Sequence, residues 1–138
     1  MNPLYTFGYQ RATHMDLERF VNLGCRIVDI RFAPWSKNPM WSRPTLEARF
    51  GSAYLHIREL GNRCYRTGEI DILNPEAGLE RLGELLETWP CVLMCVCPYL
   101  HECHRLVVAR MARDRFPGVV VEHLEPGRRL LVAAGRGP

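Results

Sequence analysis

The stretch that most constrains the fold is 91–116, where a buried strand is followed by a proline and then by a helix. Residues 91–96 form a short apolar run, which is typical of a strand in the interior of a parallel sheet. Pro98 ends the run, and apolar residues then recur at helical spacing. The pattern predicts a strand that ends at 95–97 and a helix that begins near His101.

The junction between this strand and this helix carries most of the reactive side chains of the chain. Cys95 stands at the expected strand end, and Cys103, His104 and Arg105 stand in the first turns of the expected helix. A helix N-terminus attracts anions and lowers the pKa of a nearby thiol. Cys95, Cys103 and His104 are therefore the candidate catalytic residues, although Cys95 has the alternative of a small packed residue.

A metal site and a redox pair are two other interpretations of the same residues. Cys95, Cys97, Cys103 and His104 include four ligands of the kind that zinc takes. The usual C-x2-C spacing is absent, however, and Cys95 and Cys97 share a side only if the strand continues through Val96. A disulfide between Cys95 and Cys103 is the redox alternative. We expect a metal-free site that needs no cofactor.

Strands and helices alternate through the rest of the chain. Expected strands are 4–9, 25–30, 54–57 and 119–123, with an edge strand at 129–133; expected helices follow Thr13, begin at Arg43 and follow Asn74-Pro75. A strand–helix–strand unit implies parallel strands with a right-handed crossover. This alternation predicts a single α/β domain over 1–138, with a mostly parallel sheet between two helical layers.

Polar side chains follow several of the expected strands, at the edge where such folds bind ligands. Arg31 and Arg105 have the planar cation that suits phosphate or carboxylate, so we expect them to bind an anionic substrate. Asp29 either orients a neighbour or forms an ion pair with Arg31. Tyr9 either stacks on a base or covers the core. His56 is expected to point outward or to be hydrogen-bonded locally.

Two long connections contain the remaining distinctive residues. The segment 32–44 holds several prolines with Trp35 and Trp41, and we expect an ordered loop anchored by the tryptophans. The alternative is that the two rings are platforms on which a base stacks. The segment 59–73 is a polar loop that contains glycines and arginines. These arginines either surround the pocket or form a solvated surface.

Composition excludes few functions but limits where the chain works. A net charge of +3 is too weak to indicate nucleic-acid binding by itself. No apolar run is long enough to span a bilayer, and the first ten residues do not have the pattern of a signal peptide. We therefore expect a cytoplasmic protein in which the six cysteines are thiols, ligands or catalysts rather than a disulfide framework.

Taken together, these motifs resemble the family called domain of unknown function 488 (DUF488), over about 5–121. The matching pieces are Gly8, Asp29-Ile30-Arg31, Pro34, Asn38-Pro39, Trp41, Leu60-Gly61-Asn62, Leu93-Met94-Cys95 and Cys103-His104-Arg105. The resemblance implies a small Rossmann-like fold and a pocket lined by these motifs. The sequence departs from the family pattern in two places: Tyr9-Gln10 stands where Gly8 is usually followed by His-Ser, and Cys97 stands where an acid is usual.

Two functional hypotheses follow. The first is an enzyme or ligand-binding domain for a small phosphorylated or nucleotide-like substrate, with the arginines holding the anion. A cysteine thiolate and His104 would then perform transferase or hydrolase chemistry. The alternative is a non-catalytic accessory module that binds nucleic acid or a partner protein. The sequence does not indicate an oligomeric state.

Overall fold

The structure is a computed structural model and describes residues 1–96 and 104–124. The elements within these ranges are β1 (Leu4–Gly8), α1 (His14–Asn22), β2 (Arg26–Asp29), α2 (Arg43–Phe50), β3 (Tyr54–His56), α3 (Pro75–Thr88), β4 (Cys91–Cys95), α4 (His104–Arg115) and β5 (Val121–Leu124). Short 3-10 turns lie at Pro39–Trp41, Gly51–Ala53 and Arg58–Leu60.

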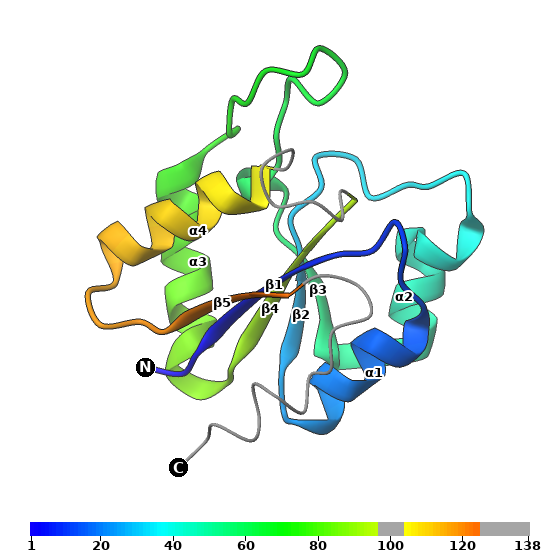
Figure 1. Cartoon of the computed structure of the whole chain (residues 1–138), viewed down its shortest axis with the longest axis horizontal. Coiled ribbons are helices and arrows are strands. Elements are labelled where there is room, and N and C mark those ends of the chain that lie inside the picture. The colour runs from blue at the N-terminus through cyan, green and yellow to red at the C-terminus, as the bar shows by residue number, and fades with distance from the viewer. Residues whose placement is uncertain (97–103, 125–138) are drawn as a thin grey trace.

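The five strands form one sheet in the order β3-β2-β4-β1-β5, and every pair is parallel. Helices α1 and α2 cover one face of this sheet, while α3 and α4 cover the other (Figure 1). The arrangement confirms the predicted Rossmann-like α/β sandwich with a parallel sheet.

Two hydrophobic clusters, one on each face of the sheet, explain the continuous apolar run of β4. The consecutive residues Leu93 and Met94 belong to different clusters, and all five residues of the strand are buried. A strand covered by helices on both faces has no polar side, so it needs apolar residues at every position. This double burial makes β4 the centre of the molecule.

The helix boundaries follow local signals in the sequence. Thr13 and Asp16 form a capping box at the start of α1, in which the Thr13 N–H donates to an Asp16 carboxylate oxygen at 2.8 Å. Asn74 caps α3 by accepting from the Ala77 N–H at 3.2 Å, and a proline at the first helical position follows it. Gly24, with a φ of 88°, supplies the left-handed residue after α1.

Some predicted boundaries differ from the structure. β2 is shorter than the predicted strand 25–30, and β5 lies about two residues later than the predicted 119–123. Trp41 is a buried anchor as expected, but Trp35 is exposed, so the anchoring prediction was wrong for Trp35. The start of the last helix near His101 and the edge strand at 129–133 lie outside the described residues.

The order of the strands and the directions of their connections leave a crevice next to β4. The helices after β1 and β2 lie on one face and the helix after β4 lies on the other, although β4 lies between those two strands. Connections that leave neighbouring strands in opposite directions create a crevice at the carboxyl ends of those strands. The ends of β2, β4 and β1 are therefore where a ligand would bind.

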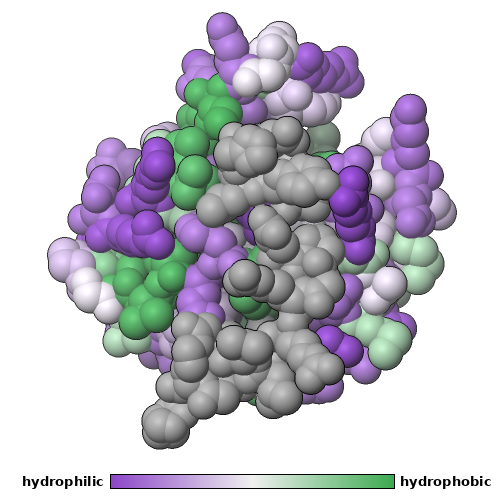
Figure 2. Space-filling model, in the orientation of Figure 1, coloured by the Kyte–Doolittle hydropathy of each residue, from purple (hydrophilic) through white to green (hydrophobic). Residues whose placement is uncertain are grey.

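In the orientation of Figure 1, the described residues on the surface are mainly hydrophilic, and the most hydrophobic of them gather on the side where α3 and α4 lie (Figure 2). In the described part of the chain, no helix combines the length and apolar character required to cross a membrane.

Candidate functional site

The turn after β2 holds a buried ion pair between Asp29 and Arg31. The Arg31 side chain donates from Nε to Asp29 Oδ1 at 2.9 Å and from Nη2 to Asp29 Oδ2 at 2.6 Å. The Arg31 backbone N–H also donates to Asp29 Oδ1 at 3.0 Å. Two parallel hydrogen bonds fix the plane of the guanidinium as well as its position.

Tyr54 on β3 completes the surroundings of the Asp29 carboxylate by donating its hydroxyl to Oδ2. Burial raises the pKa of Tyr54, and the charge and hydrogen bond of Asp29 raise it further. Burial alone would lower the pKa of Arg31, but the hydrogen bond and charge of Asp29 outweigh it, so the pKa is raised. Arg31 is therefore a permanent cation whose partner is fully buried.

Tyr9, just beyond β1, supports Arg31 from a third direction. Arg31 Nη1 donates to the Tyr9 hydroxyl at 3.3 Å, and the guanidinium carbon lies 5.2 Å from the centroid of the Tyr9 ring. The same ring stacks on Trp41 at 4.7 Å, and His14 packs edge-on against that indole at 5.0 Å. The carboxylate and this aromatic stack together hold Arg31 in one orientation.

Two histidines bind the backbone of the same turn. His104 Nε2 donates to the Ile30 carbonyl oxygen at 2.9 Å, and His56 Nε2 donates to the Arg31 carbonyl oxygen at 2.6 Å. A carbonyl oxygen only accepts, so Nε2 of each ring carries a proton. The local hydrogen bond predicted for His56 is confirmed.

The neutral form of His104 is favoured. Burial lowers the pKa of His104 below its ordinary value, while the hydrogen bond to Ile30 and the charge of Asp29 act in the opposite direction. With Nε2 protonated, Nδ1 of the neutral ring keeps its lone pair. Nδ1 makes no hydrogen bond to any other residue that the structure describes.

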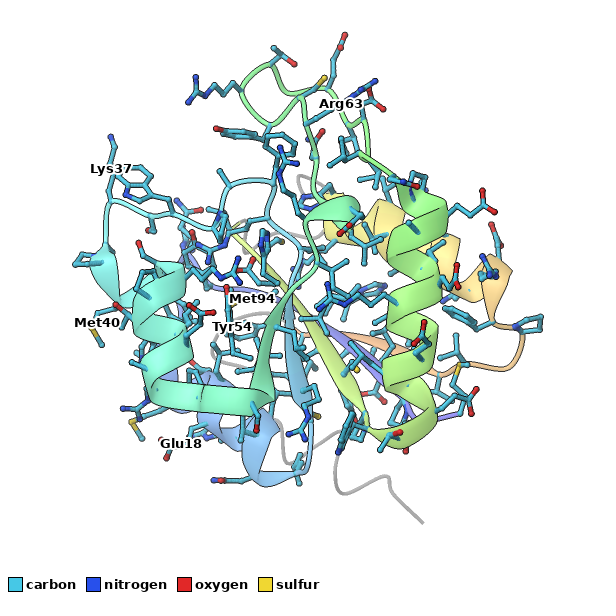
Figure 3. The ribbon with its side chains drawn as sticks, turned by 180° about the vertical axis from the view of Figure 1, so that it is seen from behind. Glu18, Lys37, Met40, Tyr54, Arg63 and Met94 are labelled. Carbon is cyan, nitrogen blue, oxygen red and sulfur yellow. The ribbon has the colours of Figure 1, made fainter. Side chains whose placement is uncertain are left out.

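A cavity of about 380 Å³ lies against Arg31 and His104. The described residues that line it are Arg31, Phe32, Ala33, Trp35, Asn62, Tyr65, Gly68, Ile70, Cys95, Val96 and His104. Its floor is the ends of β2 and β4, and its walls are the loops after β2 and after the 3-10 turn at 58–60. Figure 3 shows Lys37 and Arg63 on these two loops, beyond the carboxyl ends of the strands.

A comparison with models of known families shows which family the chain belongs to. The family model described as domain of unknown function DUF488 matches residues 22–112, a span that includes every described residue of the cavity lining. The chain belongs to the DUF488 family. No match was found among curated proteins, and none was found among solved structures.

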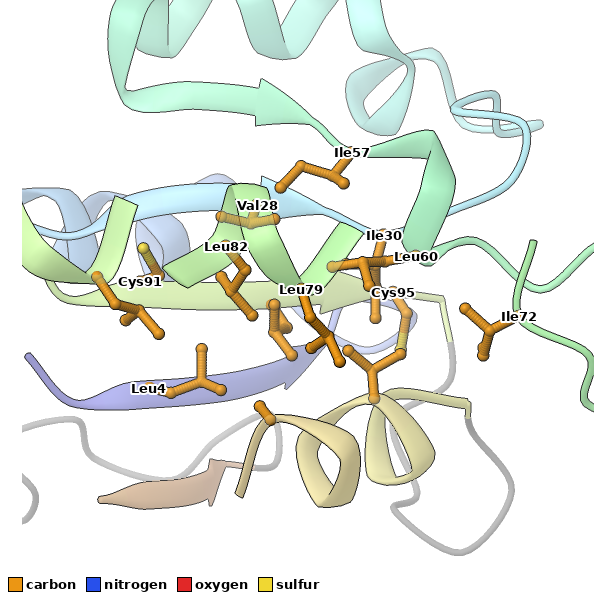
Figure 4. Packing of buried hydrophobic residues seen from close by; sticks show 14 residues of the cluster. Leu4, Val28, Ile30, Ile57, Leu60, Ile72, Leu79, Leu82, Cys91 and Cys95 are labelled. Atoms are coloured by element: carbon orange, nitrogen blue, oxygen red, sulfur yellow. The ribbon is translucent and has the colours of Figure 1, made fainter. Parts of the chain in front are cut away.

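Cys95 of this DUF488 domain lies in the cavity lining, at the end of β4. Figure 4 shows Cys91 and Cys95 at opposite ends of that strand, within one hydrophobic cluster. Cys95 is disulfide-bonded, whereas Cys25, Cys64 and Cys91 are free thiols. Burial raises the pKa of Cys25 and that of Cys91 to about 12, so both are unreactive.

Three predicted substrate-binding residues do not reach the cavity of the DUF488 domain. Asp29 and Tyr9 are buried behind Arg31 and position it. Arg105 is fully buried on the side of α4, where Nη1 donates to Thr6 Oγ1 at 3.3 Å and to the Leu124 carbonyl oxygen at 3.1 Å. Arg105 thus ties α4 to β1 and β5, and its role in substrate binding stays a prediction.

The predicted roles of Cys103 and Cys97 concern positions outside the described residues of this DUF488 domain. Within 1–96 and 104–124, no three side chains of His, Cys, Asp or Glu gather as a metal site would require. Cys95 and His104 are the two members of the considered zinc set that the structure describes, and both line the cavity. The metal-free expectation stays a prediction.

Sequence reasoning placed Asn62 in the pocket lining only through the family resemblance, and it missed Phe32, Tyr65 and Ile70, which also build the cavity walls. Asn62 has the largest structural role among them: its Oδ1 accepts from the N–H groups of Cys64 and Asp71 at 3.0 and 2.9 Å, and its Nδ2 donates to the Glu69 carbonyl oxygen at 2.8 Å. The available signal was Gly61-Asn62, because asparagine side chains often close such turns.

A Cβ on Gly61 would lie 2.6 Å from the Phe32 backbone, so only glycine allows the two loops to meet.

Proposed function

We propose that this DUF488 domain binds a small phosphorylated or nucleotide-like substrate in the cavity, with its anionic group at Arg31. The observation that carries the proposal is a buried guanidinium of fixed orientation in the cavity lining. Asp29 and Tyr9 engage three of its five N–H groups, and one N–H on each terminal nitrogen has no partner among the residues that the structure describes. A paired donor of this geometry suits phosphate oxygens.

His104 supports an enzymatic role at the same place. A neutral imidazole that lines the cavity and keeps Nδ1 as an acceptor has the properties of a general base. It would take the proton of the attacking group in a transferase or hydrolase reaction. Cys95 would be a nucleophile only after a thiol reductant has opened its disulfide, and Cys103 remains a candidate in the same proposal.

A second candidate is a non-catalytic module that binds nucleic acid. Two cations stack on rings of the cavity wall: the Arg58 guanidinium lies 4.3 Å from the Phe32 centroid and that of Arg66 lies 5.4 Å from the Tyr65 centroid. Aromatic rings beside arginines are typical of surfaces that bind single strands. Salt-dependent binding of single-stranded DNA or RNA, without binding of mononucleotides, would favour this candidate.

Calorimetric titration with inorganic phosphate tests the leading proposal. We expect saturable binding that Arg31→Lys weakens by about tenfold to a hundredfold, because lysine cannot reproduce the paired hydrogen bonds. Arg63→Lys is the matched control, since Arg63 is exposed and does not line the cavity. Thermal melting checks that both variants fold.

A measurement on the unsubstituted protein keeps the proposal testable if Arg31→Lys is unstable. Phosphate should shift the NMR signal of the Arg31 Nε–H group in a titration with one binding constant. If neither phosphate nor a mononucleotide perturbs that signal, Arg31 does not bind an anion and the proposal is wrong. The titration should be repeated with dithiothreitol, because Cys95 lines the same cavity.

A further inference from the structure

The cavity has an unusual outer wall. Trp35, Tyr65, Ile70 and Val96 line it, and these large apolar side chains remain 68%, 49%, 45% and 46% exposed. Large apolar side chains of a folded domain are mostly buried, and exposed ones that gather at one concave place indicate a binding surface. The polar floor at Arg31 and His104 and this apolar wall therefore form two different halves of one cavity.

Trp35 differs from the other two tryptophans. Trp41 stacks on Tyr9, and the Arg26 guanidinium carbon lies 4.1 Å from the centroid of a Trp89 ring. The Trp35 indole makes no ring or cation contact with any residue in the described ranges 1–96 and 104–124. With 68% of its surface exposed, the Trp35 side chain offers area for a ligand to pack against.

The backbone that carries Trp35 is nevertheless fixed. On one side the Pro34 carbonyl oxygen accepts from the Arg43 N–H at 3.0 Å, and on the other the Ser36 N–H donates to Ser42 Oγ at 3.1 Å. Both partners lie at the start of α2. An exposed ring on a fixed backbone loses little conformational entropy when a ligand packs against it.

Tyr65 is placed in a similar way by the second loop. The hydrogen bonds of Asn62 close that loop, and the Tyr65 ring lies 6.1 Å from Phe32 at 33°, centroid to centroid. Arg58 and Arg66 stack on these two rings. Two loops from different parts of the chain thus bring aromatic rings to the same cavity.

We infer that the outer half of the cavity is a base-binding subsite and that the ligand is a nucleoside phosphate. The base would stack on Trp35 and Tyr65, and the phosphate would lie at Arg31, so the inference rests on the proposed function and names its substrate class. A sugar phosphate has no planar ring to cover the indole. Phenyl phosphate has a ring but lacks the ribose that separates base from phosphate.

The described part of the subsite has little means of choosing one base. Asn62 is the one amide side chain of the described lining, and its oxygen and nitrogen are both engaged within its own loop. Stacking tolerates every base because each has a π-face. A purine should bind more tightly than a pyrimidine, since its two fused rings cover more aromatic surface.

Titrations with AMP, ribose 5-phosphate, adenosine and phenyl phosphate test the inference. We expect AMP to bind roughly 5- to 100-fold more tightly than ribose 5-phosphate, which is the contribution of one stacked base. Trp35→Ala should remove most of this advantage, and Trp35→Phe should keep part of it. Met40→Ala is the control, because Met40 is an exposed residue of the same loop that does not line the cavity.

The outcomes separate the inference from the proposed function. Equal affinities for AMP and ribose 5-phosphate, or for AMP and phenyl phosphate, overturn the nucleoside assignment but leave anion binding in place. An AMP advantage that survives Trp35→Ala shows that the base does not lie on Trp35 and also overturns it. If no phosphate compound binds, the proposed function fails and the inference fails with it. Because Trp35 is exposed, its substitution should leave the melting temperature unchanged.

Discussion

At the scale of single residues, Arg31 is held in place through the backbone of its turn as well as through its guanidinium. Two imidazoles bind carbonyl oxygens of consecutive residues, His104 at Ile30 and His56 at Arg31. The side chain of Asp29 binds the Arg31 backbone N–H as well as its guanidinium. Asp29 and His56 hold Arg31 without lining the cavity, whereas His104 does both.

His104 should make the stability of the domain depend on pH. Its pKa is lower in the folded protein than in the unfolded chain, so the unfolded chain binds the proton more readily. The free energy of unfolding should therefore be highest at neutral pH. It should fall as the pH drops through about 6.5, the pKa of histidine in the unfolded chain. His104→Gln, which keeps a donor for Ile30 but does not titrate, should reduce this slope in urea denaturation between pH 5 and 8.

A slope remains in that variant, because burial and the nearby Arg113 and Arg105 also lower the pKa of His123. His123→Asn is the matched control and should remove the part of the pH dependence that comes from His123. An unchanged pH dependence in His104→Gln would show that His104 is not neutral in the folded protein.

At the scale of elements, the two wall loops differ from the strands and helices in what fixes them. Strands and helices pack through apolar faces, whereas each wall loop is closed by hydrogen bonds from its own side chains. Asn62 closes the loop that carries Tyr65, and Ser42 closes the one that carries Trp35. Each loop is therefore sensitive to one polar residue.

Removing the Asn62 side chain should release its loop while the sheet stays intact. Asn62→Ala leaves the N–H groups of Cys64 and Asp71 without their acceptor, which should lower stability by about 1–3 kcal/mol. Trypsin should then cut faster after Arg63 and Arg66, as mass spectrometry of the fragments would show. Asn38→Ala, which loses one cap hydrogen bond in the other loop, should not change that cleavage; equal acceleration in both variants would contradict the local role of Asn62.

The elements were predictable from the sequence because periodicity and capping residues mark them. The walls were not, since nothing local in the sequence shows that two loops thirty residues apart meet. Trp35 illustrates this: an indole among prolines suggests an anchor, and only the neighbouring hydrogen bonds reveal that its backbone is fixed while its ring is open.

The floor was predicted in part. Arg31, Cys95 and His104 line one cavity because the ends of parallel strands meet at one edge of the sheet. Arg105 was expected beside them but points elsewhere. Successive residues of a helix lie about 100° apart, so a helix start that turns His104 toward the cavity turns Arg105 toward the sheet.

At the scale of the whole molecule, burial on both faces makes the centre of the sheet the most stable part. β4 pairs with β1 and β2, and all five of its residues are buried. Among the described strands β5 pairs only with β1, and three of its four residues are half-buried. Opening β4 therefore requires much of the core to unfold.

Hydrogen exchange should follow this order. Backbone N–H groups of β4 should exchange most slowly, with opening free energies near that of global unfolding, and those of β5 should exchange faster by local opening. Residue-resolved NMR exchange measures both. Equal protection of β4 and β5 would show that the domain opens as one unit and that the sheet edge has no independent motion.

The floor and the walls of the cavity are fixed by different parts of the structure, so they can change independently. The floor is built from strand ends inside the core, where a substitution disturbs packing on both faces of the sheet. Each wall loop closes on itself, so the side chain at its tip can be exchanged without altering the strands. If the floor binds an anion as proposed, exchanging the residues at Trp35 and Tyr65 would change the molecule that the cavity accepts and leave that floor in place.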